Sequence, residues 1–292
     1  MTHGEQTANR WDRSAVACGL ILALYASARI LEVAPTPLPH LAIVALDVFS
    51  AMAFALVHGT RRYGLRGILV FTAICIVVGN ALENLSIGTG FPFGHYYFVD
   101  LMGPKLFHVP VLLGLAYSGM AYVSWTLARL IVGRPSVPLT GTRVIALPLT
   151  ASFIMVAWDL AQDPVWGTVL HGWVWRDGGP WFGVPISNYL GWYFTVFIIY
   201  QFFALYLRRR PAITAASPRE HWQSPLAFYG LCAAGNVLQI IPKPNSAIVQ
   251  DPTGHAWRVA DIAGASALVS IFVMGAFVAI AWARLVEERL SP

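Results

Sequence analysis

The chain has 292 residues, of which 57% are hydrophobic and only 11% are charged. Soluble globular domains carry about 25% charged residues, so charge this sparse excludes a soluble enzyme and a disordered chain. The net charge of +5 does not indicate a nucleic-acid binder. A groove that binds phosphates needs basic residues clustered on one face, whereas the Lys and Arg residues of this chain are spread between long apolar runs. Together with a mean hydropathy of +0.61, the composition predicts an integral membrane protein in a lipid bilayer.

Charged and turn residues divide the chain into eight apolar segments. A helix needs about 20 apolar residues to cross a hydrocarbon core of about 30 Å, and helices satisfy their own backbone hydrogen bonds in lipid. We therefore expect an all-α, polytopic membrane bundle of about eight transmembrane helices, forming one domain over residues 1–292. The segments run roughly over 14–33, 41–58, 67–85, 109–132, 143–163, 188–207, 225–241 and 260–284.

The distribution of Lys and Arg predicts the orientation. With eight spans, 14 of the 19 basic residues fall on one side, and cytoplasmic loops carry the excess of Lys and Arg. Both termini are therefore expected in the cytoplasm of a cell whose inner membrane holds the protein. The two longest aromatic connections, 86–108 and 164–187, are expected to face outward.

Polar residues recur near the outer ends of the predicted helices. Asp159 and Asp163 are four residues apart, and Asn80 precedes Glu83 by three, so each pair shares a helix face. Arg29 and Glu32 at the end of the first helix are expected to form an ion pair. Acids inside a membrane are costly and mark functional sites, so Glu83, Asp159 and Asp163 are the main candidates.

A weak internal repeat surrounds these acids. Glu83 and Asp159 each precede a Val-Pro pair, Val109-Pro110 and Val184-Pro185, by a similar interval. Each interval contains an aromatic stretch ending in Phe-Gly. The repeat predicts two helix–loop–helix units, each of which presents an acid and a loop that covers it.

Two blocks of sequence carry a family resemblance. The first is Gly88-Thr-Gly-Phe-Pro-Phe-Gly94-His-Tyr96, and the second is Gly172-Trp-Val-Trp175 followed by Phe182-Gly-Val-Pro185-Ile-Ser-Asn188-Tyr-Leu-Gly-Trp192. With their flanking acids they resemble the membrane carotenoid-biosynthesis family that includes CruF-type carotenoid 1,2-hydratases and bisanhydrobacterioruberin hydratases. The blocks cover about residues 80–195, which we expect to be the catalytic core. The chain departs from the usual family pattern at four positions, His95, Phe98, His108 and Tyr117. These departures affect which carotenoid end group the protein is expected to accept, and not the type of reaction.

The resemblance implies addition of water to the terminal 1,2 double bond of a linear carotenoid, giving a tertiary alcohol. Protonating an alkene needs a dry acid and neither a metal nor a redox cofactor, and a buried carboxyl beside another carboxylate is favoured in its neutral form. Asp163 is the first choice as acid, with Asp159 beside it and Glu83 paired with Asn188 to orient water. The carotenoid is expected to contact Asn80, Phe93, Tyr96, Tyr97, His108, Trp158, Trp181, Asn188 and Trp192. Other enzymes of carotenoid biosynthesis are expected partners.

Two other functions fit the same residues. The spacing of Asp159 and Asp163 also occurs where membrane prenyltransferases bind a Mg²⁺-diphosphate, although no second acidic motif accompanies it. The third alternative is a transporter or a non-catalytic lipid-binding protein. Transporters bind near the bilayer midplane, whereas these acids lie off-centre. Asp251 is expected in an outer loop apart from the site.

Overall fold

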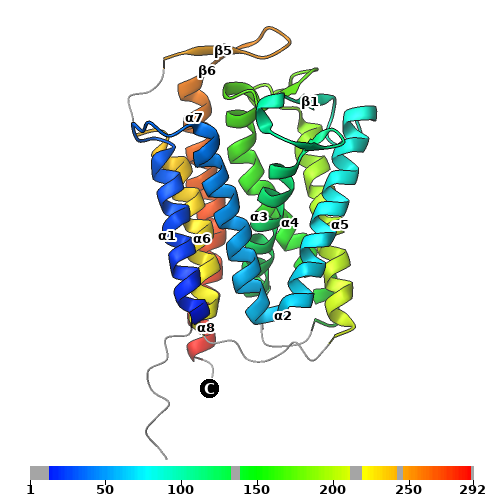
Figure 1. Ribbon diagram of the computed structural model, residues 1–292. Coiled ribbons are helices and arrows are strands. Elements are labelled where there is room, and N and C mark those ends of the chain that lie inside the picture. The colour runs from blue at the N-terminus through cyan, green and yellow to red at the C-terminus, as the bar shows by residue number, and fades with distance from the viewer. Residues whose placement is uncertain (1–12, 133–138, 211–218, 242–245, 291–292) are drawn as a thin grey trace, which may run out of the picture.

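The computed structural model describes residues 13–132, 139–210, 219–241 and 246–290, and it is an all-α bundle of long, roughly parallel helices (Figure 1). The helices are α1 (Arg13–Leu31), α2 (His40–Thr89), α3 (Val111–Ile131), α4 (Arg143–Pro164), α5 (Ile186–Arg208), α6 (Arg219–Leu238), α7 (Val259–Val269) and α8 (Gly275–Leu290). Two π-helical turns extend this set: η2 (Val165–Val169) continues α4, and η3 (Ser270–Met274) joins α7 to α8.

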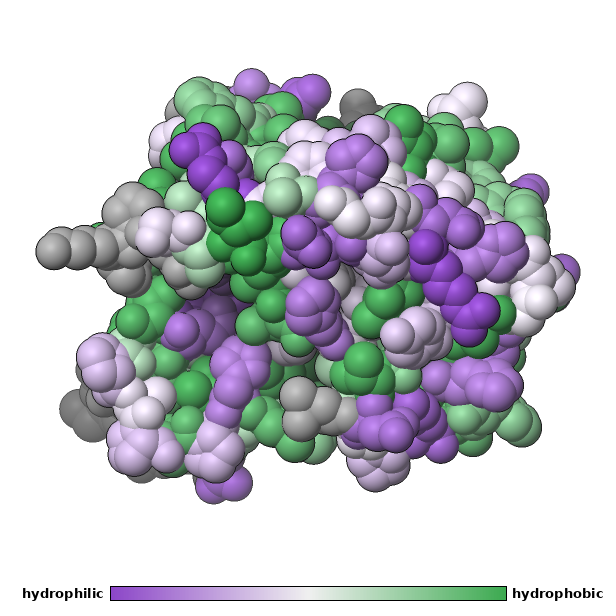
Figure 2. Space-filling model, turned by 90° about the horizontal axis from the view of Figure 1, so that it is seen from above, coloured by the Kyte–Doolittle hydropathy of each residue, from purple (hydrophilic) through white to green (hydrophobic). Residues whose placement is uncertain are grey.

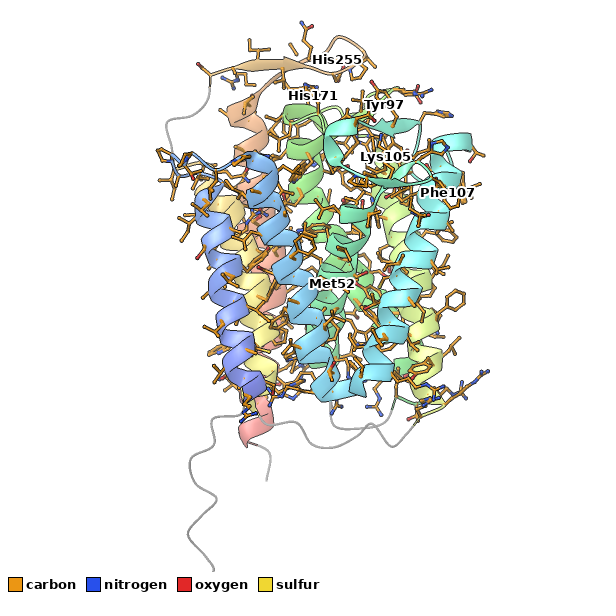
Figure 3. All side chains as sticks on the ribbon, in the orientation of Figure 1. Met52, Tyr97, Lys105, Phe107, His171 and His255 are labelled. Carbon is orange, nitrogen blue, oxygen red and sulfur yellow. The ribbon has the colours of Figure 1, made fainter. Side chains whose placement is uncertain are left out.

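The strands are short and lie in the connections at one end of the bundle, which we call the loop end (Figure 1). They form three antiparallel pairs, β1 with β4, β2 with β3 and β5 with β6. A 3-10 turn, η1 (Asp100–Met102), follows β1. The strands are β1 (Tyr96–Phe98), β2 (Lys105–Leu106), β3 (Val109–Pro110), β4 (Trp173–Trp175), β5 (Ile248–Gln250) and β6 (Ala256–Arg258). Figure 3 places Tyr97, Phe107, His171 and His255 at this end and Met52 partway along α2.

Among the described residues, six helices are long and apolar enough to cross a membrane. One of them, α2, has 50 residues, or about 75 Å at 1.5 Å per residue, and it bends back on itself at Gly64 (Figure 1). Its two halves correspond to the predicted spans 41–58 and 67–85. The remaining predicted span, 225–241, corresponds to α6, which is not among the six although it packs beside α1. The multi-pass bundle is confirmed, and the count of eight spans stays a prediction.

The bend in α2 depends on a backbone conformation that only glycine adopts readily. Gly64 has φ 68° and ψ 164°, and no atom lies within 4 Å of the place a Cβ would take. We expect Gly64→Ala to lower the free energy of unfolding by about 1–3 kcal/mol through backbone strain alone. Thermal unfolding in detergent measures this. Gly79→Ala in the same helix also meets no neighbouring atom but has no positive φ, so equal losses in both variants would contradict the explanation.

The alternating direction of the helices brings the basic residues to one end, as the sequence predicts. Arg61, Arg62 and Arg66 flank the bend, and the ends of α3, α5 and α8 and the starts of α1, α4 and α6 lie at that same end (Figure 1). Arg29, Lys105, Arg176 and Arg258 belong to the loop end. Arg10, Arg134 and Lys243, which the orientation argument also uses, lie outside the described residues.

We expect the loop end to face away from the cytoplasm. Cysteine introduced at exposed His255 should react with a membrane-impermeant thiol reagent in intact cells, and cysteine at exposed Thr60, near the bend, should not. The three natural cysteines, Cys18, Cys75 and Cys232, are buried, so the background is low. Labelling of the Thr60 variant alone would reverse the orientation.

A dense aromatic core fills the half of the bundle nearer the bend. Trp125, Tyr200 and Phe203 are fully buried against one another, and Trp125 Nε1 donates a hydrogen bond to the hydroxyl of Tyr63 at 2.9 Å. The other half of the bundle, toward the loop end, contains a cavity lined by the three acids.

Candidate active site

The two loops of the predicted repeat pair with each other above the bundle. In the β1–β4 ladder Tyr96 lies opposite Trp175, Tyr97 opposite Val174 and Phe98 opposite Trp173. Side chains alternate along a strand, and opposite residues share a face. The first and last pairs therefore point down toward the helices, while Tyr97 points away from them and is 43% exposed.

Further hydrogen bonds hold these loops on the helix ends. Ser86 on α2 accepts the backbone N–H of Phe93 at 3.1 Å and donates its hydroxyl to Gly94 O at 3.0 Å. Ser187 at the start of α5 donates to Phe93 O at 2.9 Å. The loop that follows Glu83 is thus joined to α5, the helix that comes after the second loop.

Glu83 is a buried carboxylate at the loop end of α2. It accepts a hydrogen bond from the Tyr96 hydroxyl and another, at 3.2 Å, from the Tyr117 hydroxyl on α3. Burial and the neighbouring Glu83 raise the pKa of Tyr96 well above its ordinary value, so this hydroxyl remains a donor. From the sequence, Tyr117 is recognisable only as a departure from the family pattern.

Asp159 and Asp163 lie one turn apart on α4 and share a single amide donor. Asn188, in the first turn of α5, donates Nδ2–H to Asp163 Oδ2 at 2.6 Å and lies 3.2 Å from Asp159 Oδ2. Trp173 Nε1 donates to Asp163 Oδ1 at 2.6 Å. Asp163 therefore has two short hydrogen bonds, whereas Asp159 has one longer bond and is the more exposed of the two, at 9% against 2%.

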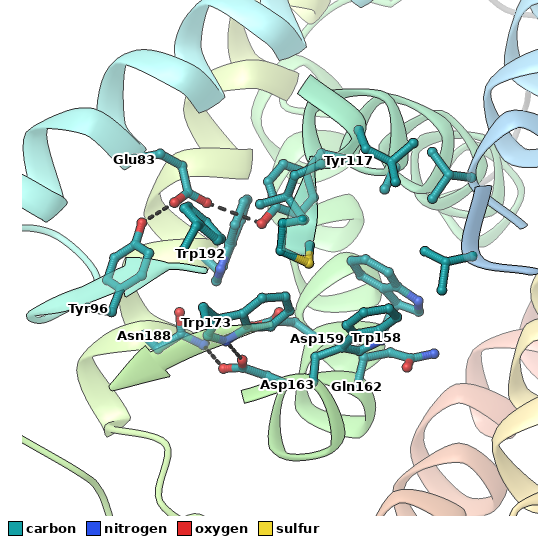
Figure 4. Close-up of a pocket in the computed structure, with 18 of the residues that line it drawn as sticks. Glu83, Tyr96, Tyr117, Trp158, Asp159, Gln162, Asp163, Trp173, Asn188 and Trp192 are labelled. Atoms are coloured by element: carbon teal, nitrogen blue, oxygen red, sulfur yellow. Dashed lines mark hydrogen bonds between the residues drawn. The ribbon is translucent and has the colours of Figure 1, made fainter. Parts of the chain in front are cut away.

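The three acids line one cavity of about 890 Å³, with Glu83 facing the aspartates across it (Figure 4). Aliphatic side chains of α2 and α3 line part of its surface, among them Val44, Val48 and Leu113. Nine aromatic side chains also line it, namely Phe93, Tyr96, Phe98, Tyr117, Trp158, Trp166, Trp173, Trp175 and Trp192. Aromatic faces stabilise a nearby cation by up to about 2 kcal/mol when water is excluded.

Five of the nine predicted contact residues line this cavity, namely Phe93, Tyr96, Trp158, Asn188 and Trp192. The other four do not. Tyr97 is turned outward by the strand alternation, and Trp181 donates its indole N–H to Leu160 O at 3.1 Å. Asn84 donates Nδ2–H to Asn80 Oδ1 at 3.0 Å and accepts the backbone N–H of His108 at its Oδ1, also at 3.0 Å. Asn80 and His108 therefore support the loop before α3.

The cavity also contains residues that sequence reasoning left without a role. Trp173 and Trp175 belong to the second sequence block, and their spacing of two residues in a strand is the signal that places both on one face. Arg29 and Glu32 form the predicted ion pair at 2.9 Å, and both line the cavity. Asp47 lies 3.7 Å from Arg29 and completes this charged group.

Asp251 lies in the β5–β6 hairpin at the loop end and does not line this cavity, as the sequence predicts. It is buried, and its carboxylate accepts hydrogen bonds from the N–H and hydroxyl of Thr253, the N–H of His255 and the indole of Trp257, at 2.7–3.1 Å. Burial by itself raises the pKa of Asp251, but these hydrogen bonds outweigh it and lower the pKa. Asp251 therefore supports the β5–β6 hairpin while ionised, and it is unsuitable as a neutral control position.

The Asp159–Asp163 spacing also allowed a Mg²⁺-diphosphate site. In the part of the chain that the structure describes, no three His, Cys, Asp or Glu side chains are arranged to hold a metal ion. Both aspartates instead face N–H donors, which a bound cation would have to displace.

Comparison with known protein families agrees with this geometry. The family described as carotenoid biosynthesis protein matches residues 41–242, which is more than two-thirds of the chain and contains all three acids. The chain belongs to this family. As a carotenoid biosynthesis protein it has a place in the synthesis of these pigments, and the resemblance found in its sequence is confirmed. A search found no curated protein and no solved structure that matches significantly.

Proposed function

We propose that this carotenoid biosynthesis protein is a hydratase, which adds water across the terminal 1,2 double bond of a linear carotenoid to give a tertiary alcohol. The observation that carries the proposal is the meeting of three buried carboxyl groups, from two distant helices, in one aromatic cavity. Such a cavity offers proton transfer and stabilisation of a cation, which are the two requirements of alkene hydration.

The reaction has two steps. A neutral carboxyl gives its proton to C2 of the substrate, and the π electrons of the double bond form the new C–H bond, which leaves a tertiary cation at C1. The oxygen of a water molecule then bonds to C1, and one proton of that water passes to a carboxylate. This proton returns to the donor acid before the next turnover, so the sum is one water added per end group, and no electrons are gained or lost.

The hydrogen bonds support a division of roles among the acids. Asp163 accepts two short N–H bonds, which favours a carboxylate, whereas Asp159 accepts one longer bond and is more open to the cavity. We assign Asp159 as the proton donor and Asp163 as the carboxylate that faces the cation. This reverses the order of preference drawn from the sequence.

Glu83, across the cavity, is assigned to the water molecule. Two tyrosine hydroxyls donate to it, so it is suited to accept a proton from the attacking water. Asn188 was expected to assist Glu83, but it donates to the aspartates instead. Its assigned role is therefore to position Asp159 and Asp163.

The test is expression in a host that makes lycopene, followed by mass analysis of the pigments. The expected result is a product heavier by one or two water molecules. Unchanged lycopene in cells that contain the folded protein would contradict the proposal. A product whose formation requires a diphosphate substrate and added Mg²⁺ would support a prenyltransferase instead.

A further inference from the structure

A second group of polar side chains lines the cavity on the side of α1, away from Glu83. Arg29 donates to Glu32 Oε1 at 2.9 Å and to Asn236 Oδ1 on α6 at 2.6 Å. Gln162 Nε2 on α4 donates to the same Asn236 oxygen at 2.9 Å. We call Arg29, Glu32, Gln162 and Asn236 the polar wall; the first three line the cavity, and the fully buried Asn236 links Arg29 to Gln162 behind them. Its hydrogen bonds join three helices that are far apart in the sequence.

The fold makes room for this wall. At Gly235, beside Asn236, an added Cβ would lie 2.2 Å from Arg29 Nε. The absence of a side chain at this position lets the guanidinium pack directly against α6. Arg29 is thereby kept 5% exposed next to the cavity.

A second cavity, of about 950 Å³, lies on the other side of the polar wall. Its lining comes from α2, α4, η2 and α7 and from the residues just after α1 and α6, all at the loop end of the bundle. Seen from that end, the surface is hollowed and hydrophilic residues lie in the hollow (Figure 2). The two cavities share only three lining residues, Glu32, Gln162 and Trp166.

This arrangement bears on how water enters. A water molecule crossing an aromatic or aliphatic wall loses its hydrogen bonds, which costs several kcal/mol, whereas ordered water needs two to four polar partners. The polar wall supplies such partners between the loop end and the acids. Gln162 and Asp159 are three residues apart on α4 and share a face, so water that passes Gln162 arrives beside the proposed donor.

We propose that water reaches the three acids through the polar wall and crosses it at Gln162, apart from the apolar surface that receives the carotenoid. The inference rests on the hydratase function proposed above. It predicts that blocking this passage slows the capture of the cation by water but does not slow the formation of the cation.

Heavy water separates the two steps. When the membranes are equilibrated with D₂O before the carotenoid is added, the donor already carries deuterium, which it transfers to C2. If water then fails to arrive, the cation returns a proton from C2 to the carboxylate, and the substrate is recovered with deuterium in place of hydrogen. Deuterium in unhydrated carotenoid therefore reports protonation, and the alcohol reports capture.

The experiment compares Gln162→Leu with Gln201→Leu in D₂O, in membranes supplied with lycopene. Gln201 lies on α5, and the same change there touches neither cavity. For Gln162→Leu we expect about tenfold less alcohol, the equivalent of about 1.4 kcal/mol and of about one hydrogen bond, with deuterium uptake into unhydrated lycopene maintained or increased. The Gln201 variant should behave as the wild type.

Two results would overturn this inference and leave the hydratase function in place: unchanged alcohol formation by Gln162→Leu, or an equal fall in alcohol and in deuterium uptake. Deuterium uptake also shows that the variant is folded, since it requires an intact acid. A wild-type protein that gives neither alcohol nor deuterium uptake would overturn the proposed function itself.

Discussion

Asp159→Asn is expected to lower the rate of carotenoid hydration by about 10²–10⁴-fold, the usual effect of removing a general acid. Asparagine keeps the shape of the side chain and a hydrogen-bonding group for Asn188, but it has no proton to transfer to an alkene. Because a neutral amide replaces a carboxyl assigned as neutral, folding should change little. Pigment analysis of the lycopene-producing host measures the activity, and the midpoint of thermal unfolding in detergent measures the stability.

Asp163→Asn and Asp261→Asn complete this test. Asp163→Asn should also lose activity, but it leaves Trp173 Nε1 and Asn188 facing an amide and should destabilise the protein as well. Asp261 is 46% exposed in an ion pair with Arg258 at the start of α7, so Asp261→Asn should hydrate normally. Full hydration by a folded Asp159→Asn protein would remove Asp159 from the mechanism. If Asp159→Asn instead abolishes folding, the acid has a structural role.

The second large effect is expected at Glu83. Glu83→Gln removes the carboxylate that receives the proton of the attacking water, and we expect hydration to fall by about 10²-fold or more. Tyr117→Phe removes a single hydrogen bond of about 0.5–1.5 kcal/mol, so it should lower the rate by about two- to tenfold. The hydration rate should therefore be lowest for Glu83→Gln, intermediate for Tyr117→Phe and highest for the wild type, because Tyr117 acts through the Glu83 carboxylate.

Glu287→Gln is the matched control for Glu83→Gln. Glu287 is 63% exposed on α8, at the end of the bundle opposite the loops, where it pairs with Arg284. The same chemical change there should leave hydration intact. A Glu83→Gln protein that keeps wild-type activity, or a Tyr117→Phe protein that loses as much as Glu83→Gln, would require another role for this part of the cavity.

Local patterns were sufficient for much of the fold and for part of the site. Long apolar runs interrupted by Arg predict the helices because lipid excludes unpaired backbone groups. Helical spacing places Asp159 and Asp163 on one face because that geometry is local to α4. The Arg29–Glu32 pair follows from the same rule and is present in the structure. In each case the information lies within a few residues of chain.

Tertiary pairing decided the rest. Tyr96 and Tyr97 are adjacent, yet only Tyr96 faces the acids, because the register of β1 against β4 sets which side of the ribbon each residue occupies. That register joins residues nearly 80 positions apart, and a shift of one would exchange the two tyrosines. Asn236 meets Arg29 across 207 residues, and the bend at Gly64 returns Glu83 to the level of the aspartates. The sequence alone could name the acids, but only packing between distant helices determined which side chains surround them and where water can reach them.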